Sequence, residues 1–276
     1  MAIQQKTLNM ALFCDFENIA LGVRDAKYAQ FDMQKILERL LLKGSIIVKK
    51  AYCDWERYRD YKPVMHEASF ELIEIPHVRQ SGKNSADIRL VVDALDLCYT
   101  KSHVDTFVII SGDSDFSPLV SKLRENNKTV IGVGVKNSSS ELLIANCDEF
   151  IFYDDLVRES EAKRKKTRKT PVKHQASAQP RTEQKDNGEE DKKQKALDLV
   201  VETVEALFEE RGEEDKLWGS MVKQALRRRM PGFNESYYGF RSFSRLLEEA
   251  RDRDLLELEL DEKSGSYIIK NVTHDD

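Results

Sequence analysis

The stretch Thr106-Phe-Val-Ile-Ile-Ser-Gly-Asp113-Ser-Asp115-Phe116 decides the fold class of this chain. It begins with a short apolar and β-branched run, which is typical of a buried strand. Two aspartates follow the run at once, and residues 116–126 then have the periodicity of a helix. A strand that passes through polar residues into a helix is the building unit of a parallel α/β sheet.

The same unit recurs along residues 9–157, where strand-like and helix-like segments alternate. This alternation predicts an α/β domain with a mainly parallel sheet and helices on both faces. The expected strands are Met10–Cys14, Ile46–Tyr52, Glu71–Ile75, Phe107–Ser111, Thr129–Val133 and Glu149–Phe152. The expected helices are Met33–Leu42, Val64–Phe70, Ala86–Leu97, Phe116–Asn126 and Glu141–Asn146.

Carboxylates stand at the ends of these strands and at the starts of the helices. Asp15 and Asp113 each follow a strand, and Asp87 and Asp115 each begin a helical pattern. Ligands of open parallel sheets bind beyond the carboxyl ends of the strands, where the strand order reverses. Converging carboxylates repel one another unless a cation holds them, and hard oxygen ligands suit Mg²⁺ or Mn²⁺. Such a cluster predicts phosphodiester cleavage, with Asn18 as a candidate for binding phosphate or orienting a metal-bound water.

Three of these aspartates also have a purely structural interpretation. Asp15, Asp87 and Asp115 could each do no more than cap a helix. Asp54 also follows a strand, but a turn or cap role is favoured for it because its strand is expected to lie to one side. Asp93 lies six positions after Asp87 and therefore on a different helical face, so we do not expect both to reach one ion.

Residues 158–194 differ in composition from the segments on either side. A basic run, Lys163-Arg-Lys-Lys-Thr-Arg-Lys169, is followed by proline, glutamine and mixed charges with almost no apolar residue. Such a segment cannot bury enough surface to fold, so a disordered charged linker is expected. The basic run is consistent both with a solvated tether and with an electrostatic contact to a phosphate backbone.

Residues 195–276 form a second expected unit. Helical patterns at Lys195–Glu210, Trp218–Arg229 and Phe240–Arg253 precede two short strands, Leu255–Leu260 and Ser266–Lys270. Three helices followed by a hairpin are the order of a small α+β winged helix-turn-helix domain. The aromatic residues of this segment favour a core role over base stacking. The candidates for phosphate contact, or else for an ordinary solvated helix face, are Lys223, Arg227, Arg228, Arg241 and Arg245.

Composition limits the class of protein and its location. A length of 276 residues is enough for two domains, and a net charge of −5 permits nucleic-acid binding where basic residues are grouped. No apolar run reaches the length of a membrane span, and the first residues lack the layout of a signal peptide. We therefore expect a cytoplasmic protein without membrane contact. The 4 cysteines show no metal-binding spacing and are expected to be reduced core thiols.

Several motifs of the first unit carry a family resemblance. Phe13-Cys-Asp15-Phe-Glu-Asn18 and Ser111-Gly-Asp113-Ser-Asp115-Phe116 resemble the opening motif and the most diagnostic motif of NYN domains, members of the PIN-like nuclease superfamily. Asn84-Ser-Ala-Asp87 resembles the middle acidic motif of the family. The resemblance covers about residues 9–155. It implies a PIN-like Rossmannoid fold and a metal-dependent ribonuclease whose acidic site is Asp15, Asp87, Asp113 and Asp115, holding Mg²⁺ or Mn²⁺.

The second unit resembles the OST-HTH, or LOTUS, domain over about residues 195–272. The resemblance is carried by Pro231-Gly-Phe233, by Tyr237-Tyr-Gly239-Phe240, and by Ser242-Phe243 with the two leucines Leu246 and Leu247. It implies binding of RNA, in some members structured G-rich RNA, and in other members docking of a protein.

The main hypothesis is therefore a cytoplasmic RNA endonuclease with residues 1–157 as the NYN domain, 158–194 as the linker and 195–276 as the LOTUS domain. Asp15, Asn18, Asp87, Asp113 and Asp115 are the expected catalytic residues, and RNA is the expected partner. One alternative is a non-catalytic RNA-binding regulator whose acidic cleft has only a structural role. Another is an adaptor that docks proteins through its C-terminal domain. The sequence leaves the oligomeric state open.

Overall fold

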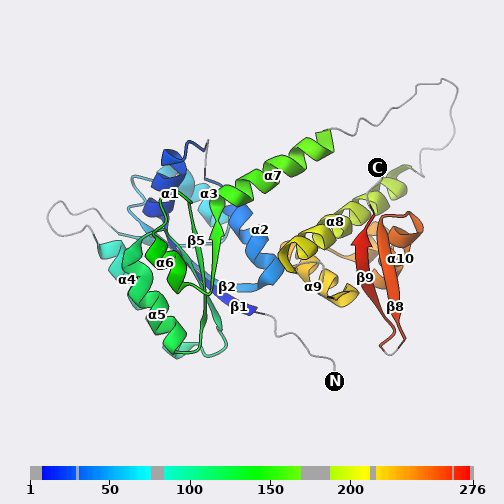
Figure 1. The fold of residues 1–276 in the computed structure, drawn as a ribbon. Coiled ribbons are helices and arrows are strands. Elements are labelled where there is room, and N and C mark those ends of the chain that lie inside the picture. Colours follow the sequence, from blue (N-terminus) through cyan, green and yellow to red (C-terminus); the bar gives the residue numbers. More distant parts are fainter. Residues whose placement is uncertain are drawn as a thin grey trace. The chain divides into compact units, whose positions relative to one another are not determined.

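The structure is a computed structural model that describes residues 8–28, 31–75, 84–168, 187–211, 216–262 and 264–273, with the backbone alone for 162–168 and 187–188. The chain forms two compact units, Met1–Val172 and Lys173–Asp276 (Figure 1). Among the described residues, no helix has both the length and the apolar character that crossing a membrane requires.

The first unit is built on a six-stranded sheet in the order β3-β2-β1-β4-β5-β6, and all neighbouring strands are parallel. The predicted α/β class is therefore confirmed. The chain adds strands outward from β1 on one side and then outward from β4 on the other, so the order reverses between β1 and β4. The strands are β1 (Leu8–Asp15), β2 (Gly44–Cys53), β3 (Glu71–Glu74), β4 (Thr106–Ile110), β5 (Thr129–Gly134) and β6 (Glu149–Phe152).

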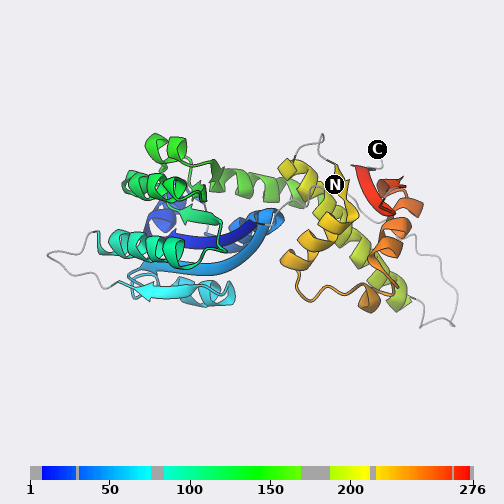
Figure 2. The same ribbon diagram turned by 90° about the horizontal axis from the view of Figure 1, so that it is seen from below.

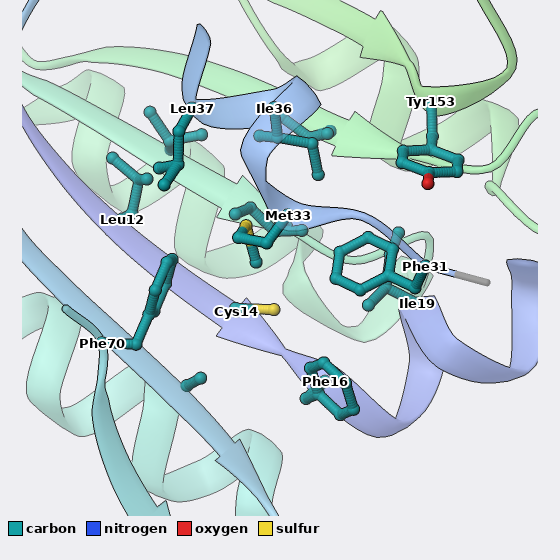
Figure 3. Packing of buried hydrophobic residues seen from close by; sticks show 14 of the residues in the cluster. Leu12, Cys14, Phe16, Ile19, Phe31, Met33, Ile36, Leu37, Phe70 and Tyr153 are labelled. Atoms are coloured by element: carbon teal, nitrogen blue, oxygen red, sulfur yellow. The ribbon is translucent and has the colours of Figure 1, made fainter. Parts of the chain in front are cut away.

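Helices cover both faces of this sheet. Successive side chains of β1 point to opposite faces, so β1 contributes to the apolar core on each face. Met10, Leu12 and Cys14 enter one apolar cluster, which includes residues of α1, α2, α3 and α7 (Figure 3). Ala11 and Phe13 enter the other cluster, together with α4, α5 and α6. The helices are α1 (Phe16–Asp25), α2 (Met33–Lys43), α3 (Lys62–Glu67), α4 (Ser85–Thr100), α5 (Ser117–Glu125), α6 (Glu141–Asn146) and α7 (Tyr153–Arg168), and short 3₁₀ turns occupy η1 (Arg59–Tyr61) and η2 (Ser114–Phe116).

The second unit contains three α-helices and a small antiparallel sheet in the order β7-β9-β8 among its described residues (Figure 2). The predicted hairpin turn is present, with Gly265 in the left-handed region at φ 67°. Strand β7 was not predicted, because two residues are too short for a sequence pattern and it pairs only with β9. The elements are α8 (Asn187–Arg211), β7 (Leu217–Trp218), α9 (Gly219–Arg229), η3 (Glu235–Tyr238), α10 (Phe243–Asp252), β8 (Leu256–Asp261) and β9 (Ser266–Val272).

Helices extend into both flanks of the expected linker 158–194. Helix α7 continues through Arg168, and α8 begins at Asn187. Charged side chains support these helical turns, because Arg158 pairs with Asp155 at 2.7 Å, and Arg253, the residue after α10, pairs with Glu190 of α8 at 2.5 Å. The prediction from composition did not take into account that such ion pairs can stabilise a helix. Residues 169–186 lie outside the described residues, so the linker there stays a prediction.

The sequence patterns also missed α1, which follows β1 without a loop. Asp15 ends the strand and caps the helix by accepting a hydrogen bond from the Asn18 N–H. Phe16, Ile19 and Val23 then form its buried face. The four cysteines are free, and Cys14, Cys53 and Cys98 are buried, as predicted.

Candidate active site

The strand order places the first and last acidic motifs side by side. Cys14 at the end of β1 pairs with Ile110 at the end of β4, so Asp15 lies next to the turn that carries Ser111 and Asp113. This is the point where the strand order reverses, and it is the usual ligand site of an open parallel sheet. Asp15 is nevertheless buried, with 7% of its surface exposed.

A chain of hydrogen bonds fixes these carboxylates. Asp15 Oδ1 accepts from the Asn18 N–H at 3.3 Å, and its Oδ2 accepts from Ser111 Oγ at 3.0 Å. Ser111 Oγ in turn accepts from the Asp113 N–H at 3.2 Å. Asp113 Oδ1 then accepts from the Asp115 N–H at 3.0 Å. The two motifs are therefore a single hydrogen-bonded unit, and movement of one carboxylate would displace the next.

Asn18 joins the turns that follow β1 and β4. Its Oδ1 accepts a hydrogen bond from the Gly112 N–H at 2.9 Å. Gly112 is packed tightly, since a Cβ there would collide with the carbonyl oxygen of Ser138. The Gly112 carbonyl also accepts from the Ser140 N–H at 2.8 Å, which ties in the loop after β5. Asn18 thus has a positioning role in the structure, and a contact with phosphate stays a prediction.

Asp87 and Asp115 complete the acidic group from two helical segments. Asp87 lies in the first turn of α4 and is half-buried, and Asp115 lies in η2 and is exposed. Burial raises the pKa of Asp87 above its usual value, and the charges of Asp113, Asp115 and Glu17 raise it further. Burial raises the pKa of Asp15 from 3.8 to about 7, with a further contribution from Asp87. Asp87 and Asp113 thus act on Asp15, and Asp113 and Asp115 act on Asp87, so the structure brings the four predicted aspartates into one connected group.

The capping interpretations divide the group in two. Asp15 caps α1 and Asp113 caps η2 through their side chains. Asp87 and Asp115 lie inside the first turn of their segments and cap neither. Capping therefore explains part of the role of Asp15 and Asp113, but it does not account for Asp87 or Asp115.

Asp54 has the turn role that was predicted for it, and Asp93 pairs with residues outside the acidic group. Asp54 accepts from the Glu56 N–H at 3.1 Å in a turn after β2. Asp93 accepts from the Tyr52 hydroxyl at 2.9 Å and pairs with Lys50 at 3.2 Å and Arg89 at 3.0 Å. The charge of Asp93 is thereby matched within the protein itself.

Sequence reasoning missed two residues of this site. Ser111 is fully buried and connects Asp15 to Asp113. Glu17 raises the pKa of Asp87 and pairs with Arg57 at 3.3 Å. Both residues lie inside the motifs quoted above, and that position was the one feature of the sequence that could have identified them as site residues. Lys136, in the loop after β5, is exposed, and its Nζ lies 6.0 Å from the centroid of the Phe152 ring.

The donor chemistry of the site fits a divalent cation. In the described part of the chain, no lysine or arginine forms an ion pair with Asp15, Asp87, Asp113 or Asp115, and like charges raise the pKa of two of them. Hard carboxylate oxygens in this state are the ligands that Mg²⁺ and Mn²⁺ prefer. As the described side chains lie, no three His, Cys, Asp or Glu groups converge on one point. The fit is therefore one of chemistry and proximity, and no ligand geometry is assigned.

A hollow of about 630 Å³ opens beside Asp115. Serine side chains and two apolar residues form its walls, so it offers both hydrogen-bonding and apolar contacts next to the acidic group. Its lining residues are Ser114, Asp115, Ser117, Pro118, Ser121 and Leu142.

The predicted basic residues of the second unit differ in how they are engaged. Lys223 and Arg227 both pair with the buried Glu235, at 2.5 Å and 3.8 Å. Arg245 pairs with Glu248 at 2.6 Å. Burial lowers the pKa of Arg228, and the charge of Arg211 lowers it further. Arg241 is exposed and has no ion pair among the described residues.

Fold, strand order and acidic edge define an α/β domain of the PIN-like nuclease superfamily. The NYN domain model matches residues 9–155, more than half of the chain, and the chain belongs to this family. The OST-HTH/LOTUS domain model matches residues 190–262. Both predicted domains are therefore confirmed, in the predicted order.

Similar proteins are distant. The meiosis regulator and mRNA stability factor 1 of Xenopus tropicalis is 25% identical over 155 residues, which are 56% of this chain and 9% of that protein. An uncharacterized protein of Methanocaldococcus jannaschii is 26% identical over 163 residues, covering 58% of this chain and 65% of that one. A crystal structure of a Vibrio parahaemolyticus protein of unknown function has a TM-score of 0.49 and 26% identity, and covers 55% of this chain and 96% of that one.

Proposed function

We propose that this protein is a metal-dependent endoribonuclease that cuts RNA at the acidic edge between β1 and β4. One observation carries the proposal. Asp15, Asp87, Asp113 and Asp115 gather where the strand order reverses, and no described cation pairs with them. A purely structural carboxylate is normally matched by a partner, as Asp93 is by Lys50 and Arg89.

Hydrogen bonds within the protein orient the carboxylates of this edge without a bound substrate. Ser111 Oγ and the Asn18 N–H hold the two oxygens of Asp15, so the buried carboxylate has a fixed orientation. Asn18 Oδ1 and the loop after β5 hold Gly112, which sets the position of Asp113. A bound Mg²⁺ or Mn²⁺ would supply a low-pKa water and charge compensation for the phosphate. Asp15, Asp87, Asp113 and Asp115 are the residues that would hold it.

The second unit supports the RNA assignment. Its family is associated with RNA binding, and it presents exposed arginines, including Arg227, Arg241 and Arg245. Phosphate contacts from such residues would position an RNA without reading its sequence. The first relative named above also has mRNA stability in its name. We propose that the second unit binds or selects the RNA that the first unit cuts.

One alternative has an observation in its favour. Among the described residues, no three potential ligands converge on a single point. A non-catalytic RNA-binding protein with an acidic but inactive edge would be consistent with that arrangement. The two functions differ in one measurable property, which is cleavage of RNA that requires a divalent cation.

The decisive experiment uses a circular RNA and the purified full chain. A circle has no ends, so only an endonuclease converts it into a linear product. We expect linear product with Mn²⁺ or Mg²⁺ and none with excess EDTA, because the carboxylates need a cation to act on phosphate. A circular single-stranded DNA of matched sequence tests selectivity for RNA.

Cleavage that continues undiminished in EDTA would rule out the metal mechanism. RNA that is bound but remains uncut with either metal would favour the non-catalytic alternative. A preparation of Asp113→Asn made in the same way controls for a contaminating nuclease.

A further inference from the structure

Helix α4 carries a stripe of exposed apolar side chains along its outer side. Ile88 is 63% exposed, Val92 55% and Tyr99 65%, and the half-buried Leu95 lies between them. These four residues are spaced by four, three and four positions, so they lie along one side of the helix. The opposite side of α4, with Leu90, Ala94 and Cys98, is buried against the sheet.

The exposed large apolar residues in the described part of the first unit are concentrated on one helix. Five large hydrophobic side chains are exposed among its described residues, namely Ile47, Ile88, Val92, Tyr99 and Leu142. Three of them belong to the single helix α4, which lies at the outer edge of the unit in Figure 1. Single exposed apolar residues are ordinary, but a continuous stripe on one helix marks an interaction surface.

We propose that this stripe is a dimer interface, in which α4 packs against α4 of a second copy of the chain in antiparallel orientation. The spacing of the stripe reads the same in both directions. A two-fold axis between Val92 and Leu95 would therefore place Val92 against Leu95 of the second copy. It would also place Ile88 against Tyr99. Self-complementarity of this kind is what a two-fold symmetric interface requires.

The charges beside the stripe are complementary under the same symmetry. Arg89 follows Ile88, and Asp96 follows Leu95, so both flank the stripe on the same side. In the antiparallel pair each Arg89 lies near Asp96 of the other copy. Asp96 is exposed and forms no ion pair with any described residue. Arg89 bonds Asp93 through Nε at 3.0 Å, and its side chain is still 55% exposed.

The surface beside the stripe can also receive a side chain. A hollow of about 610 Å³ is lined by Ser85, Ile88, Arg89, Val92, Asp93 and Asp96. In the antiparallel arrangement this is where the Tyr99 ring of the second copy would lie. The ring could pack on Ile88 and Val92 while the tyrosine hydroxyl meets the polar lining residues, and tyrosine is a common anchor of protein interfaces.

The proposed interface is small, because one helix from each copy forms it. Interfaces of this size lie at the low end of the specific range and give weak dimers. We therefore expect an association that depends on concentration in the micromolar range. The proposal does not rest on nuclease activity, since it uses only the outer side of α4 and none of the four acidic-site residues.

Sedimentation velocity of the full chain, from about 1 to 100 μM, tests the proposal. The mass should rise from 31.9 kDa toward twice that value as the concentration increases. Val92→Glu should weaken the dimer by about 10-fold or more, because it brings a charge into the apolar stripe. The matched control is Ile47→Glu, also at an exposed apolar position with 46% exposure but on β2, and it should leave the dimer unchanged.

A charge exchange identifies the partner of the stripe. Arg89→Glu alone and Asp96→Arg alone should each weaken the dimer, because each places like charges opposite one another. The double variant Arg89→Glu/Asp96→Arg should recover much of the association, since opposite charges again face each other. A melting curve for each variant shows whether the chain is still folded.

Several results would overturn the proposal. The chain could stay monomeric at 100 μM, or Val92→Glu could leave the dimer intact. Failure of the double variant to recover association would exclude the antiparallel register. A monomeric protein in which Val92→Glu lowers RNA binding would show that the stripe contacts nucleic acid instead.

Discussion

Two aspartates on helix α4 have opposite environments. Asp87 faces Asp113, Asp115 and Glu17, and burial together with these charges raises its pKa. Asp93 is also partly buried, but the Tyr52 hydroxyl, Lys50 and Arg89 stabilise its charge, and its pKa lies below the usual value. On one helix, the negative charge of Asp93 is thus compensated by cations, whereas the charge of Asp87, six residues earlier, has no cation partner among the described residues.

The difference separates structural charges from charges available to a ligand. A matched carboxylate such as Asp93 contributes to stability, because its partners would lose their bonds without it. An unmatched carboxylate such as Asp87 costs stability in the free protein and is retained only where something else compensates it. The second unit shows the same contrast in positive charge. Lys223 is matched by Glu235, whereas Arg241 has no ion pair among the described residues.

The largest expected effect is that of Asp113→Asn. This change removes a negative charge at nearly constant size, and the new side chain can still accept from the Asp115 N–H. We expect RNA cleavage to fall by about 100-fold or more while the fold is retained. Single-turnover cleavage assays and circular dichroism measure the two properties. Cleavage at the wild-type rate would exclude Asp113 from the site and break the contrast with Asp93.

The next largest effect concerns pH and Asp15. Its pKa is about 7 in the folded protein against 3.8 for the free side chain, so the folded state binds more protons between these values. Stability without metal should therefore fall as the pH rises from about 4 to about 7, by up to about 4 kcal/mol from this group. Melting temperatures in EDTA across this range, for wild type and Asp15→Asn, measure the difference.

Asp15→Asn should show a flatter dependence on pH than the wild type. Adding Mn²⁺ at pH 7.5 should raise the melting temperature of the wild type and have little effect on the variant, because a cation bound only by the folded state stabilises it. Equal slopes and equal responses to metal would show that the charge of Asp15 is compensated in some other way.

A smaller effect is expected for Asp93→Asn, and it should fall on stability and not on RNA cleavage. The amide cannot compensate Lys50 and Arg89, so the free energy of unfolding should drop by about 1–3 kcal/mol. RNA cleavage by the folded variant should stay within a few-fold of wild type. Urea unfolding and cleavage assays on the same preparation test both parts. A large loss of activity without loss of stability would place Asp93 in the site.

The smallest expected effect separates the two cations of the second unit. Arg241→Ala should weaken RNA binding a few-fold and lower the salt dependence by about one unit of slope, as expected for one lost phosphate contact. Lys223→Ala should change RNA binding less and stability more, because the buried Glu235 would lose its nearer cation and keep Arg227 at 3.8 Å. Binding across a salt titration gives both slopes. The reverse order would show that RNA displaces the Lys223–Glu235 pair.

Much of the fold could be predicted because strand and helix periodicities are local. The stretch from Thr106 to Phe116 showed its strand, its acidic turn and the following helix without any tertiary information. Helix α1 escaped prediction because it starts directly at the end of β1. Strand β7 escaped because its two residues are strand-like only when paired with β9.

The identity of the acidic residues was available from the sequence alone, since their motifs are short and contiguous. Asp15, Asp87, Asp113 and Asp115 could be named before any strand was placed. Which aspartates of the chain pair with cations, as Asp93 does, could not be named from the sequence, because such pairs join residues far apart in the chain. Lys50 lies 43 positions from Asp93, and Ser111 lies 96 positions from Asp15. The packing of α4 on β2 brings Lys50 to Asp93, and the parallel pairing of β1 with β4 brings Ser111 to Asp15, so the tertiary structure decides which aspartates stay uncompensated.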